Sequence, residues 1–309
     1  LAERAALLSK ADLLTEMVLE FADMQGVAGY YYALHDGEEP EVAAAIAQQY
    51  WPKFAGDRLP ESPTACALGL ADRLDTLVGI FGIGQAPTGS RDPFALRRAS
   101  LAVLRIMVEH RLELDLRDCL ELAAAQYPAG VIAPGSTEQV LDYMIERFRA
   151  WYEEEAIPTE VFKAVSARKL SRPLDIQRRV YAVHAFTALP EAASLAAANK
   201  RVSNILEKLD ASHQFGEVSA DLLMEPQEQE LAAKLAALTQ VARGHLENDE
   251  YTAALACLAG LKEPVDAFFD GVMVNAEDAS LRHNRLNLLK VLRELFLQVA
   301  DISQLVVAR

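Results

Sequence analysis

The chain has 309 residues, of which 51% are hydrophobic and 24% charged, and its formal net charge is −15. This balance excludes a globally disordered chain and indicates about two globular domains. Charged residues interrupt every apolar run well before the ~18 apolar positions that a membrane helix requires, so we expect no membrane contact. A strongly acidic chain repels phosphate backbones, which argues against DNA binding and restricts any RNA contact to local basic surfaces.

The cysteines and the first residue bear on the cellular compartment. Cys66, Cys119 and Cys257 lie far apart without a CxxC spacing, which argues against disulfides and zinc ribbons and favours reduced thiols. The sequence starts with Leu1, without the basic region and cleavage site of a signal peptide. We therefore expect a cytoplasmic protein whose natural start lies upstream.

Alanine and leucine dominate the chain, apolar residues recur at helical spacing, and no hairpin signal is present. The predicted fold class is therefore all-α. In the first part of the chain, helices are expected over four ranges: 3–21, 38–50, 64–78 and 93–109. Asp92 and Pro93 supply the start of the last helix, as N-cap and first helical residue. The glycine-rich stretch 79–91 is expected to be irregular.

The second half of the chain also has helical periodicity. Two helices are expected between 113 and 156, and the stretch that follows is rich in Arg and Lys and interrupted by Pro, which predicts a partly helical basic linker. The last helix carries an apolar seam from Leu281 to Val306, as in an antiparallel bundle. The predicted organisation is a first domain at 1–156, a linker at 157–189 and a helical bundle at 190–309.

Nucleotide and metal motifs are weak. Residues 84–91 approach the pattern GxxxxGK[ST], but the Lys is missing and the preceding segment is helical, so we interpret them as a turn. The histidines are scattered and HExxH is absent, so no metal site is predicted.

The order of several segments between 7 and 78 resembles the HD-domain phosphohydrolases, in which His and Asp ligands hold one or two catalytic metals. Here Ala11, Tyr31 and Tyr32 stand where that resemblance would place His ligands. Asp12 and Asp72 are the only remnants, and two carboxylates do not hold a hydrolytic metal tightly. The resemblance therefore implies a degenerate HD-like domain without hydrolytic activity.

A second resemblance covers nearly the whole chain. Its most specific segment is FGIGQAPTGSRDPFALRR at 81–98, which is long and irregular. Further segments that carry it lie at 8–18, 23–29, 71–77, 199–206, 265–274 and 281–286. The sequence resembles the carboxy-terminal half of the β subunit of bacterial glycyl-tRNA synthetases.

This resemblance implies an α2β2 ligase that joins glycine to its tRNA with ATP and Mg, with the catalytic core on the α subunit. It implies that this part of the β subunit contains the HD-like domain and a terminal anticodon-binding helical bundle, similar to that of arginyl-tRNA synthetase. The expected partners are glycine tRNA, the α subunit and the rest of the β subunit. Neither class I nor class II synthetase motifs occur, so we expect no catalytic residue and no bound cofactor in this part.

Basic and amide side chains of the last domain are the candidates for RNA contact, because Arg stacks on unpaired bases and both residue types hydrogen-bond base edges. The predicted tRNA-binding residues are Lys200, Arg201, Asn204, Arg282, Asn284, Arg285, Lys290 and Arg293. A possible second basic face consists of Arg91, Arg97, Arg98 and Arg105.

Alternatives stay open at this point. Each basic residue is also compatible with a solvated helix surface with local ion pairs. The whole chain is compatible with a metal-dependent phosphohydrolase, which the lost His ligands disfavour, or with a structural arm that docks other subunits through exposed apolar surface.

Overall fold

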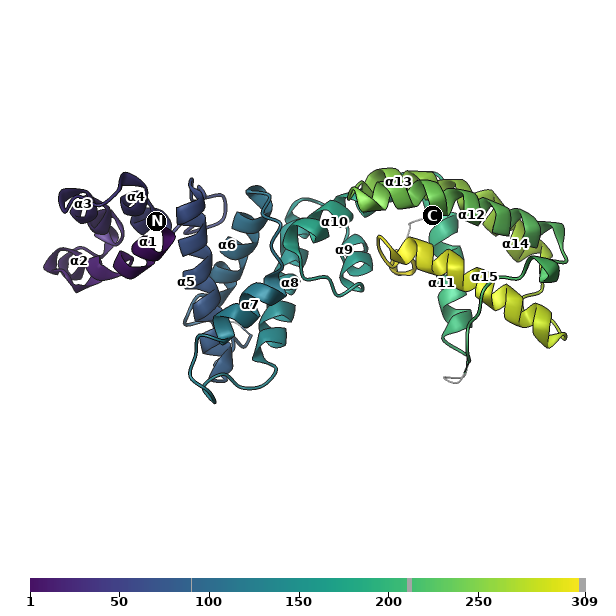
Figure 1. Cartoon of the computed structure of the whole chain (residues 1–309), viewed down its shortest axis with the longest axis horizontal. Helices are drawn as coiled ribbons and strands as arrows, with labels where there is room; N and C mark the ends of the chain where they lie inside the picture. Colours follow the sequence, from purple (N-terminus) through teal and green to yellow (C-terminus); the bar gives the residue numbers. More distant parts are fainter. Residues whose placement is uncertain (90, 210–212, 306–309) are drawn as a thin grey trace. The chain divides into compact units, whose positions relative to one another are not determined.

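A computed structural model describes residues 1–89, 91–209 and 213–305, and every helix or strand assigned within these ranges is a helix. The predicted all-α fold class is confirmed. Contacts divide the chain into two compact units (Figure 1): unit 1 is Leu1–Trp151 with Ser171–Leu174, and unit 2 is Tyr152–Leu170 with Asp175–Arg309. None of the described helices is long and apolar enough to cross a membrane.

Unit 1 is formed by short helices at its start, followed by longer ones. Its elements are α1 (Ala2–Leu8), η1 (Ala11–Leu14), α2 (Glu16–Glu20), η2 (Ala22–Met24), α3 (Val27–His35), α4 (Pro40–Gln48), α5 (Pro63–Gly82), α6 (Leu96–Glu109), α7 (Leu116–Ala124) and most of α8 (Ser136–Glu154). Helix α4 packs against α1, α3 and α5. Small side chains such as Ala43 and Ala45 let these helices approach closely around Ile46 and Leu68.

The single helix expected over 3–21 is wrong, because the segment breaks into α1, η1 and α2. The break places Asp12 inside the unit, where its carboxylate accepts hydrogen bonds from the backbone N–H groups of Gly26 (2.7 Å) and Gly29 (3.3 Å). The Thr15 side chain then caps α2 by accepting from the Val18 N–H. The apolar pattern of residues 3–21 did not predict this break, because it contains no information on the backbone N–H groups at the start of α3 that Asp12 caps.

The start of α6 differs from the prediction. Asp92 does supply a cap, accepting from the backbone N–H groups of Leu96 (2.8 Å) and Arg97 (3.0 Å). It does so from outside the helix, because Ala95 adopts a left-handed conformation (φ 55°) and the helix begins only at Leu96. Helix α5 also runs on to Gly82, into the stretch expected to be irregular.

Unit 2 contains the end of α8, then α9 (Thr159–Ser166) and most of α10 (Pro173–Thr187); α9 and α10 lie in the range predicted as the basic linker. It continues with α11 (Ala192–Leu206), η3 (Ala220–Leu222), α12 (Pro226–Glu247), α13 (Tyr251–Leu258), η4 (Ala259–Leu261), α14 (Lys262–Gly271), α15 (Ala279–Leu297) and η5 (Ile302–Gln304). The helix expected to continue to Val306 ends at Leu297, and Val306 itself lies outside the described residues. The division into 1–156, 157–189 and 190–309 stays a prediction.

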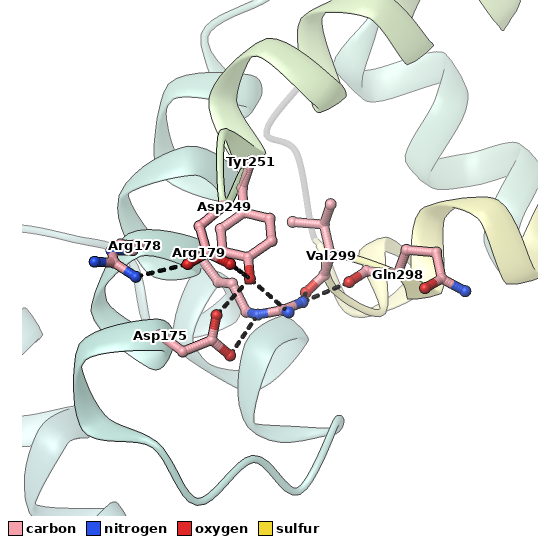
Figure 2. A network of polar contacts seen from close by, with 7 residues as sticks. All are labelled: Asp175, Arg178, Arg179, Asp249, Tyr251, Gln298 and Val299. Carbon is pink, nitrogen blue, oxygen red and sulfur yellow. Dashed lines mark hydrogen bonds and ion pairs between the residues drawn. The ribbon is translucent and has the colours of Figure 1, made fainter. Parts of the chain in front are cut away.

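Arg179 is the centre of a polar network that joins α10 to α13 and to the end of α15 (Figure 2). Its guanidinium donates to the Asp175 carboxylate (2.9 Å), to the Tyr251 hydroxyl (2.9 Å) and to the carbonyl oxygens of Gln298 and Val299. The Tyr251 hydroxyl donates to Asp175, and burial together with that bond raises the pKa of Tyr251. Some of the positive charge of the predicted linker therefore serves to hold unit 2 together.

Candidate nucleic-acid interface

Three of the predicted RNA-binding residues lie on the exposed side of α11. Lys200, Arg201 and Asn204 are all exposed. The Arg201 guanidinium lies 4.3 Å from the centre of the Phe269 ring on α14. This contact holds the guanidinium in place while it stays accessible, which suits stacking on an unpaired base.

Three more predicted residues lie on α15 with partly or fully accessible cations. Arg282 is exposed and donates to the carbonyl of Ala276 (3.0 Å). Lys290 is half-buried; its ammonium lies 4.6 Å from the centre of the Phe215 ring and 3.5 Å from Glu294. Arg293 is half-buried and forms a 3.4 Å ion pair with Asp301, which neutralises its charge locally.

Asn284 and Arg285 are buried, and the direct RNA contact predicted for them does not fit this burial. The Arg285 guanidinium forms an ion pair with the fully buried Glu228 carboxylate of α12 and donates to the Met273 carbonyl (2.8 Å). The amide of Asn284 accepts from the Ser219 N–H (2.7 Å) and donates to the Ser219 carbonyl (3.0 Å). Both side chains hold the bundle and its loop together.

The loop before η3 is a feature that the sequence reasoning missed. We call residues 213–219 the pinned loop, because Asn284 holds it at Ser219 and Asn287 holds it at Gly216 (3.1 Å) and Glu217 (3.3 Å). Its aromatic rings pack next to α15, since the His213 ring lies 4.8 Å from that of Phe215 and 5.2 Å from that of His283.

With Lys290 over Phe215, the pinned loop and α15 form a cluster of aromatic rings and cations. Such clusters bind unpaired RNA bases by stacking and by attraction to the phosphates. The signal in the sequence was the pair Asn284 and Asn287, which lie three positions apart on a helix rich in leucine. Amide side chains buried among leucines need hydrogen-bond partners, and backbone groups of a neighbouring loop can supply them.

The second basic set of unit 1 is less available than predicted. Arg97 donates to the carbonyl of Gly89, and Arg105 forms an ion pair with Glu109 (2.7 Å). Arg91 is exposed in a turn that its backbone closes with Thr88. Arg98 is exposed, and no ion pair joins it to another described residue. Arg91 and Arg98 are therefore the accessible cations of this set.

The two carboxylates interpreted as remnants of a metal site have other partners. Asp12 caps α3, and Asp72 forms a 3.0 Å ion pair with Lys10. Tyr31 and Tyr32, at the places of the lost histidines, point to solvent with exposed side chains. Among the described residues no three His, Cys, Asp or Glu side chains come together to hold a metal, so this donor set does not fit a hydrolytic metal.

A family model described as glycyl-tRNA synthetase beta subunit matches residues 1–167, more than half of the chain. The chain belongs to this family. A second family model, described as DALR anticodon binding domain, matches residues 195–302. That range begins within α11 and ends at Ile302, so it contains the pinned loop and all eight candidate residues of unit 2.

Curated relatives agree with this membership. The chain is 55% identical over 304 residues to the "Glycine--tRNA ligase beta subunit" of Actinobacillus pleuropneumoniae serotype 7 (strain AP76), covering 98% of the chain and 44% of the relative. The protein of the same name from Marinobacter nauticus is 55% identical over 306 residues, covering 99% of the chain and 44% of the relative. The chain thus spans less than half the length of these family members.

Proposed function

We propose that this chain is the tRNA-binding part of the β subunit of a glycine–tRNA ligase, and that unit 2 binds glycine tRNA at its anticodon. The ATP- and Mg-dependent joining of glycine then takes place on the α subunit, with which the β subunit assembles in the cytoplasm as α2β2. The observation that carries the proposal is the aromatic and basic cluster of α15 and the pinned loop, within the range that matches an anticodon-binding domain.

Local charge supports this assignment. The chain carries 15 net negative charges, so it has no general affinity for phosphate backbones. Arg282, Lys200 and Arg201 nevertheless remain exposed on unit 2. An RNA held by such isolated cations and by stacking binds with an affinity that falls steeply as the salt concentration rises.

The test is the affinity of labelled glycine tRNA for the chain, measured by fluorescence anisotropy. Arg282→Glu is expected to weaken binding about tenfold and to reduce the slope of log affinity against log salt by about one. Arg243→Glu on α12 is the control, because Arg243 is also exposed but belongs neither to the pinned loop nor to α15. Equal affinities of the wild type and the Arg282 variant, with a weaker Arg243 variant, would contradict the placement of the site.

One observation also supports a docking role for unit 1. Apolar side chains of its first helices are unusually exposed, with Leu7 at 74%, Leu14 at 88% and Leu19 at 74%. Exposed apolar side chains that gather on one surface are typical of a protein interface. The relatives are more than twice as long as the part that this chain covers, so the remaining β-subunit polypeptide is the occupant we propose.

Hydrogen exchange tests this docking role. Backbone amides of residues 1–35 are expected to exchange more slowly in a full-length β subunit than in this chain, while those of α12 exchange equally in both. Equal exchange of residues 1–35 in the two proteins would remove the docking role.

A further inference from the structure

Unit 1 contains a surface groove of about 790 Å³. Its lining comes from η2 and the residue after it, from the segment 49–53, from α5 and from the start of α6 with the two residues before it. The glycine-rich and basic motif around 81–98 thus delivers two side chains, Phe94 and Arg98, to this groove.

Positive charge in the groove is incompletely neutralised. The Arg73 guanidinium donates to the carbonyl oxygens of Gln49 (2.7 Å), Gly69 (2.8 Å) and Trp51 (3.0 Å), and the structure records no carboxylate bonded to it among the described residues. Burial lowers the pKa of Arg73, and the nearby Asp72 carboxylate offsets this only in part. Asp72 itself is paired with Lys10.

Two further cations line the groove and are exposed. Neither Lys53 nor Arg98 makes an ion pair within the part of the chain that the structure describes. The opposing carboxylates in the lining are Asp72, already paired, and the exposed Asp23. In a chain of net charge −15, the lining of this groove is therefore locally basic.

Aromatic and polar groups lie next to these cations. Phe94 is 43% exposed and Tyr50 lines the groove with it. The Tyr50 hydroxyl and the Gln49 Oε1 atom are buried and have no hydrogen-bond partner among the described residues. The Gln49 amide is fixed, because its Nε2 donates to the carbonyls of Ser9 (2.8 Å) and Ile46 (2.9 Å). Neither the Gln49 Oε1 atom nor the Tyr50 hydroxyl is therefore accessible to a ligand, and the groove offers the exposed Phe94 ring instead.

We propose that this groove binds one unpaired nucleotide of RNA together with its phosphate, as an RNA contact of unit 1 in addition to that of unit 2. The base stacks on Phe94, and Lys53 and Arg98 attract the phosphate. The inference rests on the proposed function, which makes RNA the source of the nucleotide. A free mononucleotide would present the same base and phosphate to the groove.

The test uses the whole chain and a 5′-phosphorylated tetranucleotide that contains 4-thiouridine. After irradiation, mass spectrometry is expected to find cross-links on the peptides that contain Tyr50 or Phe94. Phe94→Ala is expected to reduce affinity for the tetranucleotide about fivefold or more, and Arg98→Glu about tenfold. Arg111→Glu, an exposed charge reversal just after α6 and outside the groove lining, is the control and leaves it unchanged.

Cross-links confined to unit 2, or an Arg98→Glu variant that cross-links like the wild type, would overturn the inference. If AMP binds tightly and is displaced only by other free mononucleotides, and no RNA is cross-linked, the ligand of the groove is a free mononucleotide and the proposed RNA contact is wrong. Measurements with glycine tRNA separate the two proposals. If Arg282→Glu weakens binding and the groove variants do not, the groove inference is wrong and the unit 2 site stands. The reverse pattern keeps the groove and removes the unit 2 site.

Discussion

Arg285 offers the sharpest test of whether a basic residue of α15 serves the fold or the RNA. Its side chain is 7% exposed, and the Glu228 side chain that it pairs with is fully buried. Arg285→Met removes the cation and keeps the side-chain stem. It leaves the Glu228 carboxylate without its cationic partner and the Met273 carbonyl without its donor.

Removing one partner of a buried ion pair costs about 3–5 kcal/mol, because the other charge stays buried without compensation. The second oxygen of Glu228 still accepts from the backbone N–H groups of Met224 (2.8 Å) and Glu225 (2.9 Å), so the cap of α12 is kept. We therefore expect Arg285→Met to lower the free energy of unfolding of unit 2 by about 3–5 kcal/mol. Adding Glu228→Gln removes the buried charge and is expected to restore part of this loss.

Urea unfolding followed by far-ultraviolet circular dichroism measures these differences, and tRNA affinity is measured in parallel at low urea, where the variants are folded. We expect a lower unfolding midpoint with unchanged tRNA affinity. A variant that unfolds like the wild type but binds tRNA more weakly would show that Arg285 reaches the RNA after all.

Three further outcomes are expected. Folding raises the pKa of Tyr251, so the stability that the protonated Tyr251 supplies is complete below pH 10.0, the ordinary pKa of tyrosine, and is lost as the pH rises above that value. Tyr251→Phe should therefore lower the free energy of unfolding by about 1.5–3 kcal/mol at pH 7, and unfolding titrations of this variant should show a smaller loss of stability at alkaline pH. Gly29→Ala places a methyl group 2.7 Å from the Ile46 Cγ2 atom, so thermal unfolding of unit 1 should show a loss of about 1–3 kcal/mol. Asn284→Ala releases the pinned loop, so hydrogen exchange at Ser219 should accelerate and tRNA affinity should fall, and an unchanged exchange rate would argue against the tether.

The all-α class and most helix positions followed from periodicity, because apolar residues at helical spacing report which face of a helix is buried. The same helical spacing also predicts that Arg285 is buried. It lies four positions after Leu281 and three before Leu288, on the predicted apolar seam, where a charged residue indicates a buried ion pair. Its partner Glu228 lies 57 positions away, and spacing along one helix does not identify such a partner.

Other features depend on backbone conformation or on distant contacts. The left-handed Ala95 moves the start of α6 without any glycine or proline at that position to mark it. Asp12 looked like a metal ligand in the sequence, because a carboxylate that caps α3 and one that binds a metal have the same local pattern. The pinned loop requires Asn284 and Asn287 to meet residues about 70 positions earlier, so it became visible only in the folded unit.

Hydroxyl-radical footprinting of glycine tRNA tests the central claim most directly, since it locates the contact on the RNA itself. We predict that the wild-type chain protects the anticodon loop and that Arg282→Glu weakens this protection while Arg243→Glu retains it. An anticodon loop that is cleaved equally with and without the chain, at concentrations where the tRNA is bound, would contradict it.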